Sequence, residues 1–241
     1  MATLEQRTPA WHAARVGKLT ASNLGAILGQ VSYVPRTQAY KRIMGTEPFS
    51  GNIATMWGVQ NEVNGINAYQ TFTGNIVEST GLHTHKEYDW FAGSPDGFVG
   101  SEGMIEVKCP FYFRKDGSGR LHSSVPGHYL LQMNALLEIC ERQWCDYVCW
   151  SPEGMVVFRV QRDPELFETV LPYYMQVNEA MKAKAVTPPP LPSSEKEKIT
   201  LALLQSGAKC VDYKFWQNAD PHDPIPLEDI DISPPHKRPK F

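Results

Sequence analysis

The sequence predicts an α+β fold in which helices flank a mixed, mainly antiparallel central sheet. Residues 55–72 (TMWGVQNEVNGINAYQTF) place apolar side chains mostly at three- and four-residue steps, which is the spacing of a helix. Residues 75–111 instead divide into short apolar segments separated by Gly, Pro, Asp and Ser, a pattern typical of antiparallel strands and turns. A sheet covered by helices is the architecture that these two patterns favour.

Composition limits the class of protein. The 241 residues are 42% hydrophobic, enough for one large domain, or one domain with an appendage. No apolar run reaches the roughly 18 residues of a membrane span, and the first residues lack a secretory pattern, so we expect a cytoplasmic protein (host cytoplasm if phage-encoded) with no membrane partner. The net charge of −3 argues against a nonspecifically basic protein but allows DNA binding in a local groove. Five cysteines without a disulfide spacing predict reduced thiols.

Two helix starts are expected near the beginning of the chain. Thr8 and Pro9 suit the N-cap and first position of a helix that ends near Gly17. A second start lies at residues 20–23 (TASN), where the Ser22 hydroxyl and its neighbours can satisfy free backbone N–H groups. Such a helix start is a natural seat for a phosphate.

The second half of the chain predicts a helix over 127–143, strands over 144–150 and 154–161, and a helix over 163–186 that is interrupted or kinked at Pro172. We expect one domain over residues 1–187. Residues 188–241 are expected to form a Pro-rich linker and a largely flexible tail, with one short helix over 197–208 and disorder from about residue 220.

The stretch GSPDGFVGSEGMIEVKCP (residues 93–110) carries the chemistry. In a strand, side chains alternate between faces, so Glu106 and Lys108 share one face roughly 6–7 Å apart while Ile105 and Val107 pack on the other. A turn at SEG folds the two strands into a hairpin and returns Asp96 towards Glu106.

Two converging carboxylates are hard oxygen ligands of the kind that select Mg²⁺ or Mn²⁺. A bound ion lowers the pKa of its water and offsets charge on a phosphorus, and an adjacent lysine orients the nucleophile or stabilises developing charge. These are a nuclease's requirements. Taken alone, the hairpin fits a charged turn with a weak surface ion pair equally well.

Five ordered segments, spread over about residues 10–185, resemble the PD-(D/E)XK nuclease superfamily and, more narrowly, the lambda-type phage exonucleases or YqaJ-like viral recombinases. These segments are AWHAARVGKLTAS, MWGVQNE, GSPDG, EVKCPF and YLLQMNALL. The resemblance implies a restriction-endonuclease-like core. It also implies a Mg²⁺ site, with Mn²⁺ as a possible substitute, whose ligands are Asp96, Glu106, the Val107 carbonyl and Glu62.

The same resemblance assigns roles around the metal. Lys108 is expected to orient or activate the attacking water, and Gln132 is expected to hold the water or the lysine in place. An arginine and two serines bind the 5′-terminal phosphate of DNA in the family, and the matching positions are Arg15, Ser22 and Ser94.

The function implied is 5′→3′ exonuclease activity on double-stranded DNA ends, leaving 3′ single-stranded overhangs for phage-type recombination by strand annealing. The expected assembly is a homo-trimeric ring, with a single-strand annealing protein or single-strand binding protein as a possible partner. The alternatives are a structure-specific or restriction-like endonuclease, and a non-catalytic DNA-end-binding recombination factor.

Other signals have ordinary explanations. Five cysteines and histidines could suggest a zinc or iron–sulfur site, but their spacing is wrong for a Cys-x-x-Cys pair and we expect no structural metal there: Cys140, Cys145, Cys149, His83 and His85. Most of the six tryptophans are expected in the core rather than stacked on bases.

Overall fold

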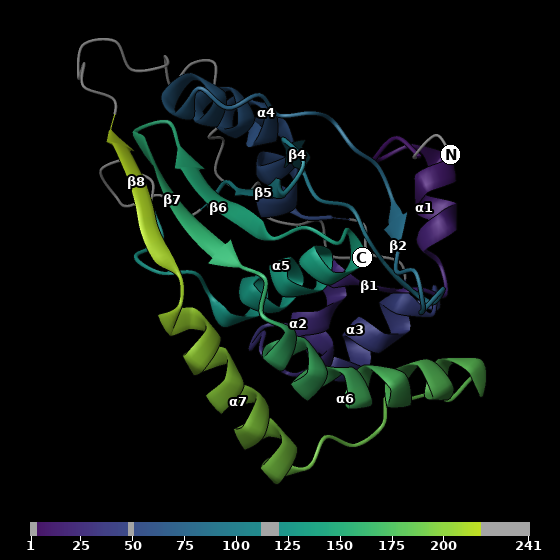
Figure 1. Cartoon of the computed structure of the whole chain (residues 1–241). Helices are drawn as coiled ribbons and strands as arrows, with labels where there is room; N and C mark the ends of the chain where they lie inside the picture. The colour runs from purple at the N-terminus through teal and green to yellow at the C-terminus, as the bar shows by residue number, and fades with distance from the viewer. Residues whose placement is uncertain (1–3, 48–50, 112–120, 218–241) are drawn as a thin grey trace.

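The central element is a five-stranded sheet. The computed structural model describes residues 4–47, 51–111 and 121–217. The strands lie in the order β4-β5-β6-β7-β8, where β5 and β6 are parallel and the other neighbours are antiparallel (Figure 1). The mixed, mainly antiparallel sheet is therefore confirmed. Its strands are β4 (Gly97–Val99), β5 (Gly103–Lys108), β6 (Trp144–Ser151), β7 (Gly154–Gln161) and β8 (Val211–Gln217).

Helices cover both faces of this sheet. Helix α4 (Ile53–Thr73) lies above the sheet in Figure 1, and α5 (Gly127–Ile139) lies below it. Alternate residues of β5 enter two separate cores: Met104 joins the core on the α5 side, whereas Ile105 and Val107 join the core on the α4 side. The predicted alternation along β5 is confirmed, and it directs Glu106 and Lys108 towards α5.

A small second sheet joins the N-terminal elements to the hairpin. Its order is β1-β3-β2, with β1 parallel and β2 antiparallel to β3. Strand β3 leads directly to the Ser94-Pro95-Asp96 segment, so the small sheet fixes the entry to β4. The strands are β1 (Leu19–Thr20), β2 (His83–Thr84) and β3 (Phe91–Gly93).

The first predicted helix is confirmed as α1 (Pro9–Arg15), which Thr8 caps by accepting a hydrogen bond from the Trp11 N–H. The second start is a short 3₁₀ turn, η1 (Ala21–Asn23), followed by α2 (Leu24–Ile27). The expected side-chain capping there is wrong, because neither Thr20 nor Asn23 makes a side-chain cap bond. The Thr20 and Ser22 hydroxyl groups accept hydrogen bonds from Arg15 instead. A helix not anticipated from the sequence, α3 (Arg36–Ile43), packs against α2.

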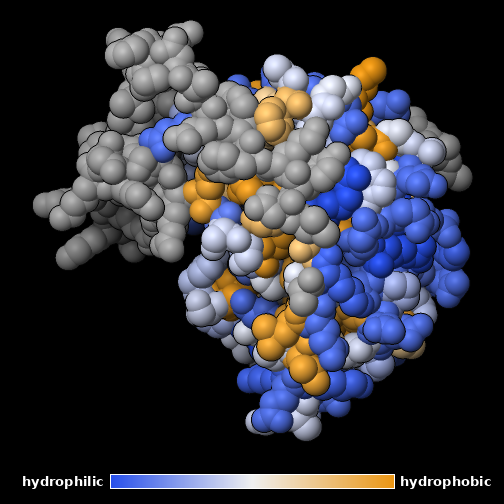
Figure 2. Space-filling model, turned by 60° about the vertical axis from the view of Figure 1, so that its left-hand side comes forward, coloured by the Kyte–Doolittle hydropathy of each residue, from blue (hydrophilic) through white to orange (hydrophobic). Residues whose placement is uncertain are grey.

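The second half of the chain folds largely as expected. Strands β6 and β7 match their predicted ranges within one residue, and α5 matches the predicted helix except for its last turn. Helix α6 (Pro164–Lys182) runs through Pro172 without interruption. None of the helices in the described ranges is both long and apolar enough to span a membrane. Figure 2 shows apolar side chains gathered near the middle of one face and hydrophilic ones covering its right-hand part.

The segment after residue 187 differs from the expected flexible tail. Helix α7 (Ser193–Ala208) packs on α5 and α6, and β8 extends the central sheet, so the expected boundary does not separate two units. The proline-rich stretch is also tied to the rest of the fold, because Arg36 and Tyr173 both donate to the Pro189 carbonyl oxygen. The composition of this segment did not reveal that it packs on the domain. The packing depends on Ile199 and Leu203, which α7 buries. Residues 218–241, where disorder was expected, lie outside the described part.

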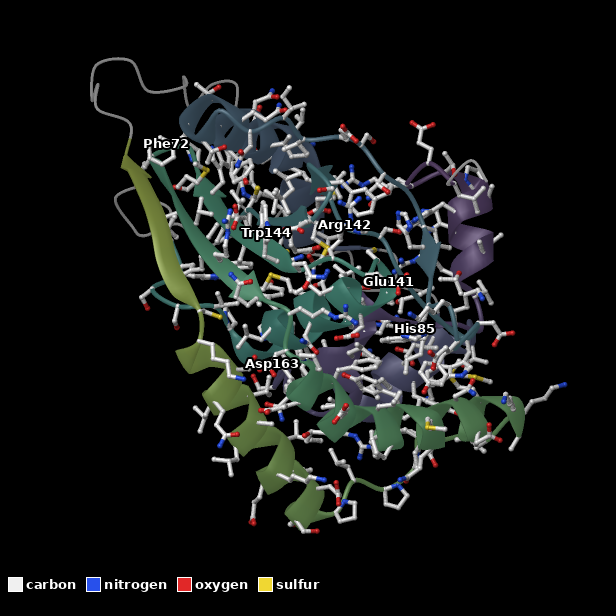
Figure 3. The ribbon with its side chains drawn as sticks, in the orientation of Figure 1. Phe72, His85, Glu141, Arg142, Trp144 and Asp163 are labelled. Atoms are coloured by element: carbon white, nitrogen blue, oxygen red, sulfur yellow. The ribbon has the colours of Figure 1, made fainter. Side chains whose placement is uncertain are left out.

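The end of α7 is also fixed by charge. Lys209 donates to Asp163 Oδ2 at 3.0 Å, which joins the end of α7 to the start of α6 (Figure 3). Asp163 also caps α6 through the Leu166 N–H.

Candidate active site

The hairpin of β4 and β5 brings Asp96 against the chain of β5. The Asp96 N–H donates to the Ile105 carbonyl at 3.2 Å, and the Val107 N–H donates to Asp96 Oδ2 at 2.7 Å. A residue with a side chain does not fit after Asp96, because a Cβ on Gly97 would lie 2.2 Å from Val77 Cγ1. Pro95-Asp96-Gly97 is thus a turn whose carboxylate is locked in register with the second acidic strand.

Glu106 lies at the centre of the site and is 3% exposed. Its Oε1 accepts hydrogen bonds from Lys108 Nζ at 2.5 Å and from Gln132 Nε2 at 2.6 Å. Its Oε2 is buried and has no hydrogen-bond partner among the described residues. The strand places Lys108 on the same face as Glu106, and α5 packs on that face and supplies Gln132. The structure therefore brings Asp96, Glu106, Lys108 and Gln132 together.

The charges in this cluster act strongly on each other. Burial, with the nearby charges of Glu106 and Glu62, holds the pKa of Asp96 well above its usual range, although Lys108 and the Val107 N–H act in the opposite direction. Burial alone would lower the pKa of Lys108, but the Glu106 and Asp96 carboxylates outweigh it and raise that pKa. Lys108 is therefore a protonated donor at neutral pH.

Glu62, on α4, is placed differently from the expectation. Its carboxylate forms an ion pair with Arg7 Nη2. Burial raises the pKa of Glu62, while the Arg7 charge opposes that shift and the Glu106 charge adds to it. Glu62 thus lies within electrostatic reach of the hairpin but is held by a cation from the N-terminal segment.

The residues of the hairpin fit a hard divalent cation. Over residues 4–47, 51–111 and 121–217, no three His, Cys, Asp or Glu side chains converge closely enough to share one ion. The Glu106 charge does act on Asp96, however, and the buried Glu106 Oε2, which has no partner among the described residues, is an oxygen that a divalent cation could bind. Asp96 and Glu106 could hold a metal directly, and Glu62 could join them by leaving Arg7.

The three residues expected at a 5′-phosphate lie in one neighbourhood. Arg15 Nη2 donates to Ser22 Oγ at 3.1 Å and to Thr20 Oγ1 at 3.3 Å. Ser94 is joined to them through Trp11, whose Nε1 donates to Ser94 Oγ at 2.9 Å and whose ring lies 4.1 Å from Arg15 Cζ. Burial lowers the pKa of Arg15 to about 10, so it remains a cation at neutral pH.

Three residues near the site did not stand out in the sequence. Trp11 lies outside the core and bridges Ser94 and Arg15; its place one turn before Arg15 was an available signal. Tyr129 lies three residues before Gln132 on the same face of α5, and its ring centre is 4.9 Å from Lys108 Nζ. Arg7 had no such signal, because it lies in an irregular segment.

Comparisons with known proteins agree with this geometry. An alkaline exonuclease (LHK-Exo) from Laribacter hongkongensis is similar over 82% of this chain and 99% of its own, with 27% identity and a TM-score of 0.58. The structure of LHK-Exo in complex with dAMP is similar over 83% of this chain and 93% of its own, with 26% identity and a TM-score of 0.53. No curated protein matches the chain.

These likenesses identify the fold as restriction-endonuclease-like, as the sequence predicted. The family model described as the YqaJ-like viral recombinase domain matches residues 10–143. That match covers more than half of the chain and contains the hairpin, Glu62, Gln132 and the Arg15 cluster. The chain belongs to the YqaJ-like viral recombinase domain family.

Proposed function

We propose that this protein is a Mg²⁺-dependent 5′→3′ exonuclease that acts on double-stranded DNA ends and leaves 3′ single-stranded overhangs for recombination by strand annealing. The observation that carries the proposal is the divided Glu106 carboxylate. One oxygen accepts from both Lys108 and Gln132, and the other is buried with no partner in the described part of the chain. A carboxylate used only for structure would have both oxygens satisfied.

In this mechanism Asp96, Glu106 and the Val107 carbonyl would hold Mg²⁺, with Mn²⁺ as a substitute. The bound ion would supply an activated water and charge neutralisation at the phosphorus. Lys108 remains protonated, because the neighbouring carboxylates raise its pKa, so it orients the nucleophile and stabilises negative charge rather than accepting a proton. Gln132 keeps the Glu106 carboxylate and the lysine in a fixed relation.

End recognition is assigned to Arg15, Ser22 and Ser94. A cationic guanidinium and two hydroxyl groups match the charge and hydrogen-bonding capacity of a terminal phosphate. Because Ser94 lies two residues before Asp96, the phosphate seat and the hydrolytic centre share one segment of chain.

The proposal includes a trimeric ring threaded by DNA, a cytoplasmic site of action and a single-strand annealing or single-strand binding protein as partner. Enclosure by a ring gives processivity without strong nonspecific attraction, which suits a net charge of −3. LHK-Exo binds dAMP, a nucleotide of the kind that DNA hydrolysis releases.

The test compares linear duplex DNA, with and without a 5′ phosphate, with closed circular DNA in the presence of Mg²⁺. We expect loss of 5′ nucleotides from the phosphorylated linear duplex, an intact circle, and loss of cleavage in Lys108→Ala with DNA binding retained. Lys86→Ala is the matched control, since Lys86 donates to Glu141 Oε1 at the same 2.5 Å but on the surface. Cleavage of circles would favour an endonuclease, and binding without cleavage would favour an end-binding factor.

A further inference from the structure

An arginine forms an ion pair with Glu62, the helical glutamate that the family pattern assigns to the metal. Arg7 and Glu62 lie 55 positions apart in the sequence, yet Arg7 Nη2 pairs with Glu62 Oε2. The Arg7 side chain is 44% exposed and the Glu62 side chain 22% exposed, so ions from solvent reach the pair. This contact decides whether the Glu62 carboxylate is free to turn towards the hairpin.

The N-terminal segment delivers Arg7 to this position by several fixed contacts. Gln6 Nε2 donates to the Pro95 carbonyl at 2.8 Å, and the Leu82 N–H donates to the Leu4 carbonyl at 3.3 Å. Arg7 itself has a φ of 68°, in the left-handed region that non-glycine residues rarely adopt. The Gln6 side chain therefore ties this segment to the residue preceding Asp96, and the backbone conformation of Arg7 directs its side chain towards α4.

The Arg7 guanidinium balances the negative charge of Glu62, as a bound metal cation would. Glu62 is partly buried and feels the negative charge of Glu106, and both effects disfavour its ionised form. Arg7 opposes them with one positive charge. A divalent cation at Asp96 and Glu106 would carry two charges and bind several carboxylates at once, so the two cations compete for one carboxylate.

We propose that Arg7 is a built-in counter-ion that competes with the divalent cation for Glu62 and releases that carboxylate when the metal binds. The inference rests on the proposed metal-dependent function. A partly exposed ion pair is weak, so the metal displaces the guanidinium instead of being excluded by it. Arg7 is thus a positioning residue that keeps the Glu62 carboxylate engaged in an ion pair while the metal is absent.

The experiment measures Mn²⁺ binding to the full chain by isothermal titration calorimetry, without DNA. We expect Arg7→Gln to lower the dissociation constant about two- to fivefold, the effect of removing one weak competing ion pair. Arg7→Lys, which keeps the charge, should stay near the wild-type value. Arg142→Gln is the matched control, because Arg142 (Figure 3) lies against the hairpin turn, donating to the Gly100 carbonyl, and pairs with no site carboxylate that the structure describes.

A double-mutant cycle with Glu62→Gln makes the test specific. In the Glu62→Gln background, Arg7→Gln should no longer change the dissociation constant, because the contested carboxylate is gone. Thermal unfolding of each variant shows whether it folds. Unchanged or weaker Mn²⁺ binding in Arg7→Gln would overturn the competition, and weaker binding would mean that Arg7 directs Glu62 to the metal. A wild-type chain that binds no Mn²⁺ would instead overturn the proposed function itself.

Discussion

Two buried carboxylates on neighbouring strands differ in how completely their oxygens are hydrogen-bonded. Asp146 on β6 is fully buried, and both its oxygens are satisfied: Arg159 donates to each at 2.8 Å, and the Tyr69 hydroxyl donates to Oδ2 at 2.7 Å. Glu106 on β5 is almost as buried, but all of its hydrogen bonds fall on one oxygen. Asp146 faces α4 and Glu106 faces α5, so the sheet keeps the two networks apart.

The difference separates a structural charge from a functional one. The Asp146 network is closed: Arg159 balances the charge and also stacks on Trp144, with Cζ 3.8 Å from the ring centre. The Glu106 network is open at Oε2, and the charge of Glu106, after burial, helps to raise the pKa of Asp96. Burying a charge is costly unless every hydrogen-bonding position is filled, so an open oxygen in the same sheet indicates a position kept for a ligand.

The largest expected effect is that of Glu106→Gln on activity. The amide can still accept from Lys108 and Gln132, but the open oxygen and the negative charge are lost, so DNA cleavage should fall by about 10³-fold. Thermal stability should change less than in Asp146→Asn, because the nearby Asp96 carboxylate remains to balance the Lys108 charge. Nuclease rates and melting temperatures measured together check both parts. Substantial residual cleavage, or a large fall in melting temperature, would place Glu106 with the structural charges.

Asp146→Asn should do the reverse. It leaves the Arg159 charge against a neutral amide in the core, and breaking such a pair costs about 3 kcal/mol in the free energy of unfolding. For a chain of this size that corresponds to a fall of roughly 6–12 °C in melting temperature. Glu179→Gln, which removes an exposed charge paired with Lys182, is the control and should change little. If Mn²⁺ binding falls in Asp146→Asn while stability does not, the comparison breaks down.

Helix α4 serves both networks, and Gly65 tests how closely they are linked. A Cβ on Gly65 would lie 2.5 Å from Val107 Cγ1, so Gly65→Ala must push α4 away from β5 and should cost about 1–3 kcal/mol in unfolding free energy. Glu62 lies one turn before Gly65 and Tyr69 one turn after it, so both networks should loosen.

The same helix supplies the control. Gly58 has no neighbour within 4 Å of a built Cβ, so Gly58→Ala should stabilise the protein by about 0.5–1 kcal/mol. Urea unfolding of the two variants gives both values. Equal effects of the two substitutions would mean that α4 does not pack on β5 as closely as described.

The sequence predicted those parts of the site that follow from local periodicity. Alternation along β5 places Glu106 beside Lys108, and the turn at Gly97 returns Asp96, so local rules were sufficient for the hairpin. The partners from elsewhere were not accessible in this way. Whether Glu62 meets a metal or Arg7 depends on an irregular segment 55 positions away, and no local pattern records such a contact.

The C-terminal strand was missed for a different reason. Val211, Tyr213 and Phe215 alternate with Asp212 and Lys214, which is the period of a half-buried strand. The proline-rich stretch before it outweighed this signal, because prolines usually mark a linker. A proline has no backbone N–H to donate, but its carbonyl can still accept, and the Pro189 carbonyl accepts hydrogen bonds from Arg36 and Tyr173.

The smallest expected effect is a loss of stability as the pH is lowered. His128 begins α5 beside the Glu106 cluster, where burial and then the charges of Lys108 and His122 lower its pKa to about 4. An unfolded histidine titrates near pH 6.5, so His128 contributes stability that is present above pH 6.5 and is lost as the pH falls towards 4. Allowing for solvent screening of a half-buried ring, the loss is about 1–2 kcal/mol.

His128→Gln keeps the Cβ that contacts Gly25 but removes the titrating ring, so it should lose less stability than the wild type between pH 7.5 and 5. Urea unfolding at the two pH values measures this, and His12→Gln, at an exposed position on α1, is the control that should follow the wild type. If His128→Gln and the wild type weaken equally, acid acts elsewhere. In that case the positive charge of Lys108 has little effect at the start of α5. The charges of the Glu106 cluster would then act on their surroundings less strongly than its hydrogen bonds indicate.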